Sequence, residues 1–297
     1  MKIGIDWGGT KIEALALDPI TNNEINRIRI EAPKNDYKKI LQAVVGLIDE
    51  ISGSEKNYSV GIGMPGSIHP QTGKVQVSNT KALENQTVKK DLEDILGFKI
   101  KIANDADCLA LSEATDGAGK NFQNVFAVIL GTGVGAGHVV NNLLVQGPNK
   151  LTGEWGQNPI PGPMDDYEKT VKRHCGRIGA IEVFLSGPGL EDFYEYIARK
   201  RNNSKEIVKL FRDGDEVAIN VMDIYFERLA RSFSTFVNII DPDIIVCGGG
   251  MSEVDEIYDE IKKRIIPYIA SNYFLTPIVK AVHGSSSGVR GAAHLWD

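Results

Sequence analysis

The chain has few cysteines, no long apolar run and no excess of positive charge, and each lack excludes a class of protein. Its three cysteines in 297 residues, Cys108, Cys175 and Cys247, are too few and too scattered for a disulfide framework. We therefore expect a reducing compartment and predict a cytoplasmic protein. The longest apolar runs, such as residues 125–130, fall far short of the roughly 20 residues that cross a bilayer. A net charge of -6 argues against nucleic acid or an anionic membrane as a partner.

Two further signals are absent. A strand pattern begins at residues 3–5, which leaves no room for the apolar stretch of a signal peptide. The chain contains no Gly-x-x-x-x-Gly-Lys-Ser/Thr string, so a P-loop is excluded. The run from Gly131 to Ala136 matches the dinucleotide fingerprint by letter, but it leads into a strand pattern rather than a helix, so we reject a Rossmann site.

Two segments look like copies of one strand, glycine turn and strand. The first comprises residues 3–17, with its turn at residues 6–11; the second comprises residues 125–140, with its turn at residues 131–137. Asn141 and Asn142 give a turn signal after the second copy. Copies about 120 residues apart predict two α/β lobes. We expect an N-terminal lobe over residues 1–118 and a C-terminal lobe over residues 119–285, with a last helix at about 286–297 packing back on the first lobe.

The spacing of apolar residues predicts one helix after each of these copies. Residues 37–51 repeat at helical spacing after Asp36, a cap candidate. Residues 215–240 form a longer amphipathic run that ends before Asp241-Pro242. Between them, prolines at residues 159, 161 and 163 predict an irregular loop over residues 157–175. Loops of that length are often functional.

Several residues can be interpreted in a structural or a functional way. Glycine turns bind phosphate because backbone N–H groups can approach the oxygens, yet a single glycine hairpin is usually only a hairpin. Asp6 follows a strand and can cap a turn or hold a cation. Asp105 precedes a helical pattern and can cap that helix or accept a proton. Two matched glycine turns favour phosphate.

Strings distributed along essentially the whole chain resemble the ROK branch of the actin, Hsp70 and sugar-kinase superfamily. They are Asp6-Trp7-Gly8-Gly9-Thr10-Lys11, Gly131-Thr132-Gly133-Val134-Gly135, Asp241-Pro242-Asp243 and Cys247-Gly248-Gly249-Gly250-Met251-Ser252. The resemblance implies an α/β, two-lobed actin-like ATPase (ribonuclease H-like) fold with a catalytic cleft between the lobes. Within the family the chain looks most like bacterial fructokinases that also accept mannose, through Gly63-Met64-Pro65-Gly66-Ser67-Ile68, Gly153-Glu154-Trp155-Gly156 and residues 286–293.

The same resemblance implies roles for individual residues. Asp105 is the general base that takes the proton of a sugar hydroxyl during phosphoryl transfer. Asp6 holds Mg²⁺ through water. The nucleotide contacts are Asp6, Gly8, Gly9, Thr10, Lys11, Gly131, Thr132 and Gly133 for the phosphates and Gly248, Gly249 and Gly250 for the adenosine. The sugar contacts are Gly66, Asn79, Asn104, Asp105, Glu154, Gln157 and Glu182.

The chain departs from the family at its structural zinc. Where the family has one histidine and three cysteines, this chain has Gln157, Arg173, Cys175 and Ala180. One plausible ligand cannot make a closed tetrahedral site, so we expect no structural zinc. We expect Trp155 and the prolines to stabilise the loop instead. Because the family's histidine also touches the sugar, Gln157 leaves the sugar preference open.

These observations predict an ATP-dependent hexose kinase that phosphorylates the 6-hydroxyl, with fructose first and mannose or glucose behind it. The alternatives are an N-acetylhexosamine kinase and a catalytically silent sugar sensor on the same scaffold. A transcriptional regulator is disfavoured because the phosphate hairpin begins at residue 3, with no helix-turn-helix before it. A chaperone-like or actin-like ATPase would leave Asp105 and Glu154 without a purpose. The expected partners are a hexose and ATP; the resemblance also allows a homodimer.

Overall fold

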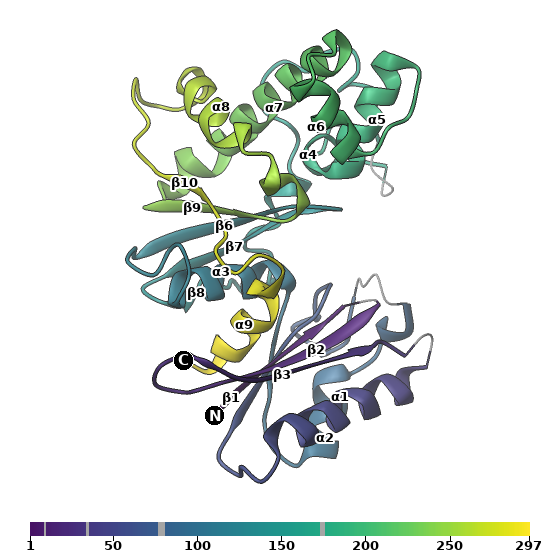
Figure 1. Ribbon diagram of the computed structural model, residues 1–297, viewed down its shortest axis with the longest axis vertical. Coiled ribbons are helices and arrows are strands. Elements are labelled where there is room, and N and C mark those ends of the chain that lie inside the picture. Colours follow the sequence, from purple (N-terminus) through teal and green to yellow (C-terminus); the bar gives the residue numbers. More distant parts are fainter. Residues whose placement is uncertain (9, 34–35, 77–80, 173–175) are drawn as a thin grey trace. The chain divides into compact units, whose positions relative to one another are not determined.

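The computed structural model in Figure 1 describes residues 1–8, 10–33, 36–76, 81–172 and 176–297. Of the residues singled out in the sequence, Gly9, Asn79, Arg173 and Cys175 lie outside the described residues. The chain forms two compact units. Unit 1 comprises residues 1–123, 137–152 and 282–297, and unit 2 comprises residues 124–136 and 153–281.

Unit 1 is built on a five-stranded sheet. Its order is β3 (Glu24–Glu31), β2 (Lys11–Leu17), β1 (Lys2–Trp7), β4 (Ser59–Gly63) and β5 (Lys101–Ala103). Strand β1 pairs antiparallel with β2 and parallel with β4. Parallel central strands need cover on both faces, and the sheet has it: α1 and α2 lie on one face and α9 on the other (Figure 1).

The remaining elements of unit 1 are mostly helical. They are α1 (Tyr37–Ser52), η1 (Lys81–Leu83), α2 (Val88–Leu96), α3 (Asp105–Thr115), η5 (Gly284–Ser286), α9 (Ser287–Ala293) and η6 (His294–Trp296). Helix α1 confirms the first predicted helix, and the Asp36 side chain accepts a hydrogen bond from the Lys39 N–H at 3.1 Å, as expected of its cap. The short strand β8 (Leu143–Leu144) follows Asn141 and Asn142, whose positive φ angles of 52° and 63° confirm the predicted turn.

Helix α9 contacts the sheet through glycines that let the two backbones meet. A methyl group on Gly4 would lie 2.0 Å from the Val289 carbonyl oxygen, and one on Gly61 would lie 1.9 Å from that of Ala292. Both distances are far below van der Waals contact, so only glycine fits at these places in β1 and β4.

Unit 2 contains β6 (Asn124–Leu130), β9 (Ile244–Gly248) and β10 (Ile278–Lys280) in parallel pairing, together with the start of β7 (Val134–Val140). The order of the second sheet is β8, β7, β6, β9 and β10. It repeats the order β3, β2, β1, β4 and β5 of the first sheet, strand by strand. The helical elements of unit 2 are η2 (Glu154–Gln157), α4 (Glu182–Leu185), α5 (Gly187–Ala198), α6 (Ser204–Arg212), α7 (Glu216–Ile240), η3 (Gly250–Glu253), α8 (Glu256–Arg264) and η4 (Ile266–Tyr268).

Most sequence-based boundaries in unit 2 are confirmed, and one is wrong. Helix α7 confirms the long predicted helix and ends at Ile240, before Asp241. Between η2 and α4, the described residues form no helix or strand, as predicted for the irregular loop. The glycine turn is shorter than expected, because β7 already begins at Val134 and includes Gly135 and Gly137. Gly137 belongs to the strand because helix α3 lies against it: a methyl group there would be 2.4 Å from the Ala106 carbonyl oxygen. Among the described residues, no helix is long and apolar enough to cross a membrane.

The close contact between β4 and α9 is testable by adding one methyl group. Gly61→Ala should destabilise the protein by about 2 kcal/mol or more, because the new methyl group would overlap the Ala292 carbonyl. The matched control is Gly46→Ala in α1, where nothing lies within 4 Å and alanine favours the helix by up to about 1 kcal/mol. Thermal unfolding of both variants measures the difference; equal melting temperatures would contradict the packing of α9.

Candidate active site

The turn between β1 and β2 in unit 1 presents its tip to solvent. The Gly8 N–H donates to the Lys11 carbonyl at 2.9 Å and closes the turn, while the Thr10 carbonyl accepts from the Ala32 N–H at 3.0 Å. The side chains of Thr10 and Lys11 remain exposed. A hydroxyl and an ammonium group on a tight exposed turn are suited to phosphate oxygens.

Asp6 lies at the end of β1 among other carboxylates. Burial, together with the nearby charges of Glu13 and Asp105, raises the pKa of Asp6 to about 6, while Arg29 lowers it. The structure therefore brings the predicted magnesium residue and the predicted base close enough to interact. Helix α9 covers Asp6 from the other side, since a methyl group on Gly288 would lie 3.4 Å from the Asp6 carboxyl carbon. Glu13 is already paired with Arg27 and Arg29, so Asp6 is the carboxylate whose ionised form a nearby divalent cation would favour, in keeping with a metal held through water.

The sequence left open whether Asp105 caps helix α3 or accepts a proton, and the structure gives the cap to Asn104. Asn104 is the N-cap of α3: its Oδ1 accepts a hydrogen bond from the Asp107 N–H at 2.6 Å. Asp105 is the first residue of the helix, and its Oδ1 accepts from the Ala106 N–H at 3.0 Å. Its side chain keeps an exposed surface, and desolvation raises its pKa while the hydrogen bond from the Ala106 N–H lowers it. Asp105 is thus not needed as the helix cap.

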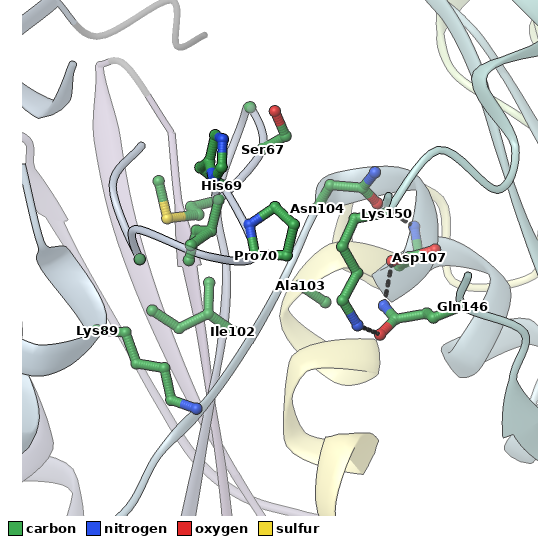
Figure 2. Close-up of a pocket in the computed structure, with 14 residues that line it drawn as sticks. Ser67, His69, Pro70, Lys89, Ile102, Ala103, Asn104, Asp107, Gln146 and Lys150 are labelled. Atoms are coloured by element: carbon green, nitrogen blue, oxygen red, sulfur yellow. Dashed lines mark hydrogen bonds between the residues drawn. The ribbon is translucent and has the colours of Figure 1, made fainter. Parts of the chain in front are cut away.

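A pocket of about 330 Å³ in unit 1 begins beside Asn104 (Figure 2). Gly66, with a positive φ of 105°, lines the same pocket, so the structure brings these two predicted sugar residues together. The other lining residues are Met64, Ser67, Ile68, His69, Pro70, Gly73, Lys89, Ile102, Ala103, Asp107, Gln146 and Lys150. Apolar side chains and polar groups therefore share its wall.

One wall of the pocket is held by a chain of hydrogen bonds that the sequence did not indicate. Gln146 Nε2 donates to Asp107 Oδ2 at 2.9 Å, and Lys150 Nζ donates to Gln146 Oε1 at 2.6 Å (Figure 2). Asp107 stands three residues after Asn104, the observed cap of α3, at the position where an acidic side chain is common at the start of a helix. Gln146 and Lys150 come from an irregular segment after β8, where no periodic pattern marks them.

In unit 2 the predicted phosphate and adenosine turns lie side by side. The Gly131 N–H donates to the Gly133 carbonyl at 3.0 Å, which closes the turn between β6 and β7 and leaves Thr132 exposed. A methyl group on Gly131 would lie 4.0 Å from the Gly249 Cα. Gly249 itself has a φ of 86°, and a methyl group there would lie 2.5 Å from the Leu130 carbonyl. Gly248 ends β9 and Gly250 begins η3, so this turn joins a strand to a short 3-10 helix.

Three predicted sugar residues also gather in unit 2. Glu154 and Gln157 lie on η2, whose preceding residue, Gly153, accepts a hydrogen bond from the Ala136 N–H at 2.9 Å and so ties η2 to β7. Trp155 packs edge-on against Phe233 and Phe236 of α7, at centroid distances of 5.7 and 5.3 Å. This is the packing expected to stabilise the loop.

Glu182 begins α4 and reaches the glycine hairpin. Its Oε2 accepts from the Val134 N–H at 3.3 Å, and a methyl group on Gly133 would lie 3.0 Å from that same oxygen. Gly133 therefore lets a carboxylate approach the turn. Among the described residues, no group of three histidine, cysteine, aspartate or glutamate side chains could hold a metal ion. Gln157 and Ala180 are described but Arg173 and Cys175 are not, so the absence of structural zinc stays a prediction, as does the homodimer.

Comparison with known proteins gives one consistent result. The model of the ROK family matches residues 2–297. The chain is 36% identical over 303 residues to an N-acetyl-D-glucosamine kinase of Vibrio atlanticus and 38% identical over 305 residues to one of Photobacterium profundum; each match covers 99% of both chains. A crystal structure of a ROK hexokinase from Thermus thermophilus superposes with a TM-score of 0.89 at 23% identity, covering 99% of this chain and 97% of the other. This likeness confirms the predicted α/β, actin-like ATPase fold.

The raised pKa of Asp6 should appear in the pH dependence of stability. The folded state favours the protonated carboxyl, so its contribution to stability is complete below pH 3.8 and is lost as the pH rises through about 6. Asp6→Asn should therefore match the wild type near pH 4 and exceed its stability at pH 8 by up to roughly 3 kcal/mol.

Thermal unfolding in metal-free buffer between pH 4 and pH 8 measures this difference. Asp94→Asn, which changes a carboxylate of α2 whose side chain is 62% exposed, is the matched control and should show no such trend. A stability difference for Asp6→Asn that stays constant across this range would contradict the unfavourable burial of its charge.

Proposed function

The chain belongs to the ROK family, and on this premise we propose that it is a kinase that transfers the γ-phosphoryl group of ATP to the 6-hydroxyl of an N-acetylhexosamine, with N-acetyl-D-glucosamine as the first candidate. The observation that carries the proposal is the nearly full-length likeness to N-acetyl-D-glucosamine kinases of two bacteria. It favours the N-acetylhexosamine alternative over fructose, which the motifs alone had placed first.

Asp105 is the general base of the proposed reaction. A sugar hydroxyl is a weak nucleophile, and a carboxylate within reach can accept its proton as the bond to phosphorus forms. Because desolvation raises the pKa of Asp105, its carboxylate is a stronger base than an ordinary aspartate. The cap made by Asn104 keeps α3 intact without using Asp105, and the Nδ2 group of Asn104 is a donor for a sugar oxygen.

The glycine turns account for the proposed nucleotide site. In unit 1, Gly8, Thr10 and Lys11 would face phosphate oxygens, and Asp6 would hold Mg²⁺ through water. Magnesium neutralises phosphate charge when it is bound. In unit 2, the neighbouring turns at residues 131–133 and 248–250 would hold the phosphates and the adenosine, since glycine lets the backbone N–H groups approach a ligand closely.

The pocket beside Asn104 supports an N-acetyl sugar as the proposed substrate. An acetamido group combines a methyl group with one hydrogen-bond donor and one acceptor. Ile68 and Ile102 supply apolar wall, while Gln146 and Lys150 supply polar groups (Figure 2). We assign this pocket to the acetamido group. In unit 2, Glu154, Gln157 and Glu182 would accept or donate hydrogen bonds to sugar hydroxyls, which discriminates between sugars better than apolar contact does.

The proposed function is tested by ADP release with Mg-ATP and a panel of N-acetyl-D-glucosamine, N-acetyl-D-mannosamine, glucose, mannose and fructose. N-acetyl-D-glucosamine should give the highest kcat/KM. Asp105→Asn should lower kcat by about 10²- to 10⁴-fold, because the proton acceptor is lost. The exposed Asp94→Asn should leave kcat unchanged. Turnover of fructose above every N-acetyl sugar would overturn the assignment, and binding without turnover would make the protein a sensor.

If the acetamido group occupies this pocket, narrowing the pocket should change the preference between N-acetyl-D-glucosamine and glucose rather than abolish kinase activity. Ile68→Phe narrows the pocket, so kcat/KM for N-acetyl-D-glucosamine should fall about tenfold relative to that for glucose, in line with apolar discrimination of 1–3 kcal/mol. Ile68→Leu preserves the volume and is the control. An equal loss for both sugars would show that the acetamido group does not occupy this pocket.

A further inference from the structure

A fully buried carboxylate in unit 2 is enclosed by two arginines that the proposed reaction does not use. Glu168 has no exposed surface, and Arg228 and Arg231 are 1% and 8% exposed. Arg228 Nε donates to Glu168 Oε1 at 2.9 Å, and Arg231 Nη2 donates to the same oxygen at 2.5 Å. Burying three charges is unfavourable unless they are paired as closely as this. We call these three residues the loop anchor.

The loop anchor joins an irregular segment to a rigid one. Both arginines lie on helix α7, three positions apart and therefore on one face. Glu168 comes from the loop between η2 and α4. The anchor consequently fixes the loop to the longest helix of unit 2.

The two guanidinium groups hold the loop at more than one point. Arg231 Nη1 donates to the carbonyl oxygens of Pro161 and Pro163, at 3.1 and 3.4 Å, and Arg228 Nη2 donates to Asp165 Oδ2 at 3.1 Å. The Pro161 and Pro163 carbonyl oxygens lie outside any helix or strand, so these side-chain hydrogen bonds take the place of backbone hydrogen bonds. The path of the loop between residues 161 and 168 is thus determined by α7.

Arg228 also reaches the element that carries Glu182. Its guanidinium carbon lies 4.1 Å from the ring centroid of Phe193 and 5.0 Å from that of Phe184, both within the range of cation–π attraction. Phe184 is part of α4, two residues after Glu182. The anchor therefore contacts both the loop and the helix that follows it.

The two ends of the loop are joined next to the proposed sugar residues. The Ile181 N–H donates to the Asn158 carbonyl at 2.9 Å, and the Ile160 N–H donates to the Gly179 carbonyl at 2.7 Å. Gln157 and Glu182 are the residues just outside this junction. These two backbone hydrogen bonds would transmit a shift in the loop to the side chains of Gln157 and Glu182.

We propose that Glu168, Arg228 and Arg231 are positioning residues for sugar recognition: through the loop they set the places of Gln157 and Glu182. This inference rests on the proposed function, in which those two residues contact the sugar. Displaced hydrogen-bonding groups weaken sugar binding. Glu182 also contacts the glycine turn at Val134, but the turn is closed by its own hydrogen bond from the Gly131 N–H to the Gly133 carbonyl, so binding of the nucleotide should change less than binding of the sugar.

The experiment compares the Michaelis constants of the two substrates. Glu168→Gln keeps the shape of the side chain and removes its charge, so KM for N-acetyl-D-glucosamine should rise about tenfold while KM for ATP changes less than about twofold. Arg231→Lys keeps the charge but loses the planar group that reaches the Pro161 and Pro163 carbonyls, so it should show the same effect to a smaller degree. Arg264→Gln is the control: Arg264 lines one pocket together with Arg228 and Arg231 but pairs with Asp223 and Glu260. Its sugar KM should equal that of the wild type.

All assays are made well below the melting temperature of each variant, with circular dichroism to confirm folding. If Glu168→Gln and Arg231→Lys lower the melting temperature but keep the wild-type sugar KM, the anchor is only structural and the inference is wrong. If Glu168→Gln does not fold, the sugar KM of Arg231→Lys decides alone. If the wild type turns over no sugar, the proposed reaction fails, and the dissociation constant for N-acetyl-D-glucosamine in wild type and variants then tests the anchor. Absence of both turnover and binding overturns the proposed function and the inference together.

Discussion

The close contact between helix α9 and the first sheet is the constraint on which the unit 1 half of the candidate site depends. Gly4 and Gly61 allow the helix backbone to touch β1 and β4, which only residues without a side chain permit. This contact brings Gly288 against Asp6 and packs the helix beside α3, which begins with Asp105. A segment from the end of the chain thus covers Asp6, near its beginning. Desolvation raises the pKa of Asp6 and of Asp105, although the Asp105 side chain keeps an exposed surface.

Asp6 lies among charges that are unfavourable for folding and suited to binding a cation. The charges of Glu13 and Asp105 raise its pKa, while Arg29, which pairs with Glu13, lowers it. Active sites commonly contain such unfavourable groups, with the surrounding fold supplying the stability. Asn104 is an example of that supply: it caps α3, so the Asp105 carboxylate is not needed as the cap. A cation is the ligand that would turn this repulsion into binding energy.

In unit 2, rigidity comes from a different source. The glycine turns at Gly131 and Gly249 are held by neighbouring backbone, and Glu182 approaches them because Gly133 has no side chain. The long loop has no such ladder along its body, and the ion cluster around Glu168 supplies its attachment instead. Buried ion pairs add little net stability compared with an apolar core, but they specify one geometry. Geometry is what recognition of a sugar needs.

Elements whose signals are local can be predicted from the amino-acid sequence. The apolar period marked α1 and α7, Asp36 marked a cap, and the two glycine turns with Asp6 and Asp105 pointed to a kinase of this family. The sequence made the second glycine turn too long, because Gly135 and Gly137 belong to strand β7, where Gly137 lets helix α3 approach. That Asn104 rather than Asp105 caps α3 was decided by local geometry, in a single hydrogen bond that the residue types alone do not specify. The pairing of Gln146 with Asp107 and of Glu168 with α7 was decided only by the tertiary structure. Both pairings join residues far apart in the chain, and neither spacing nor composition records which distant residues meet.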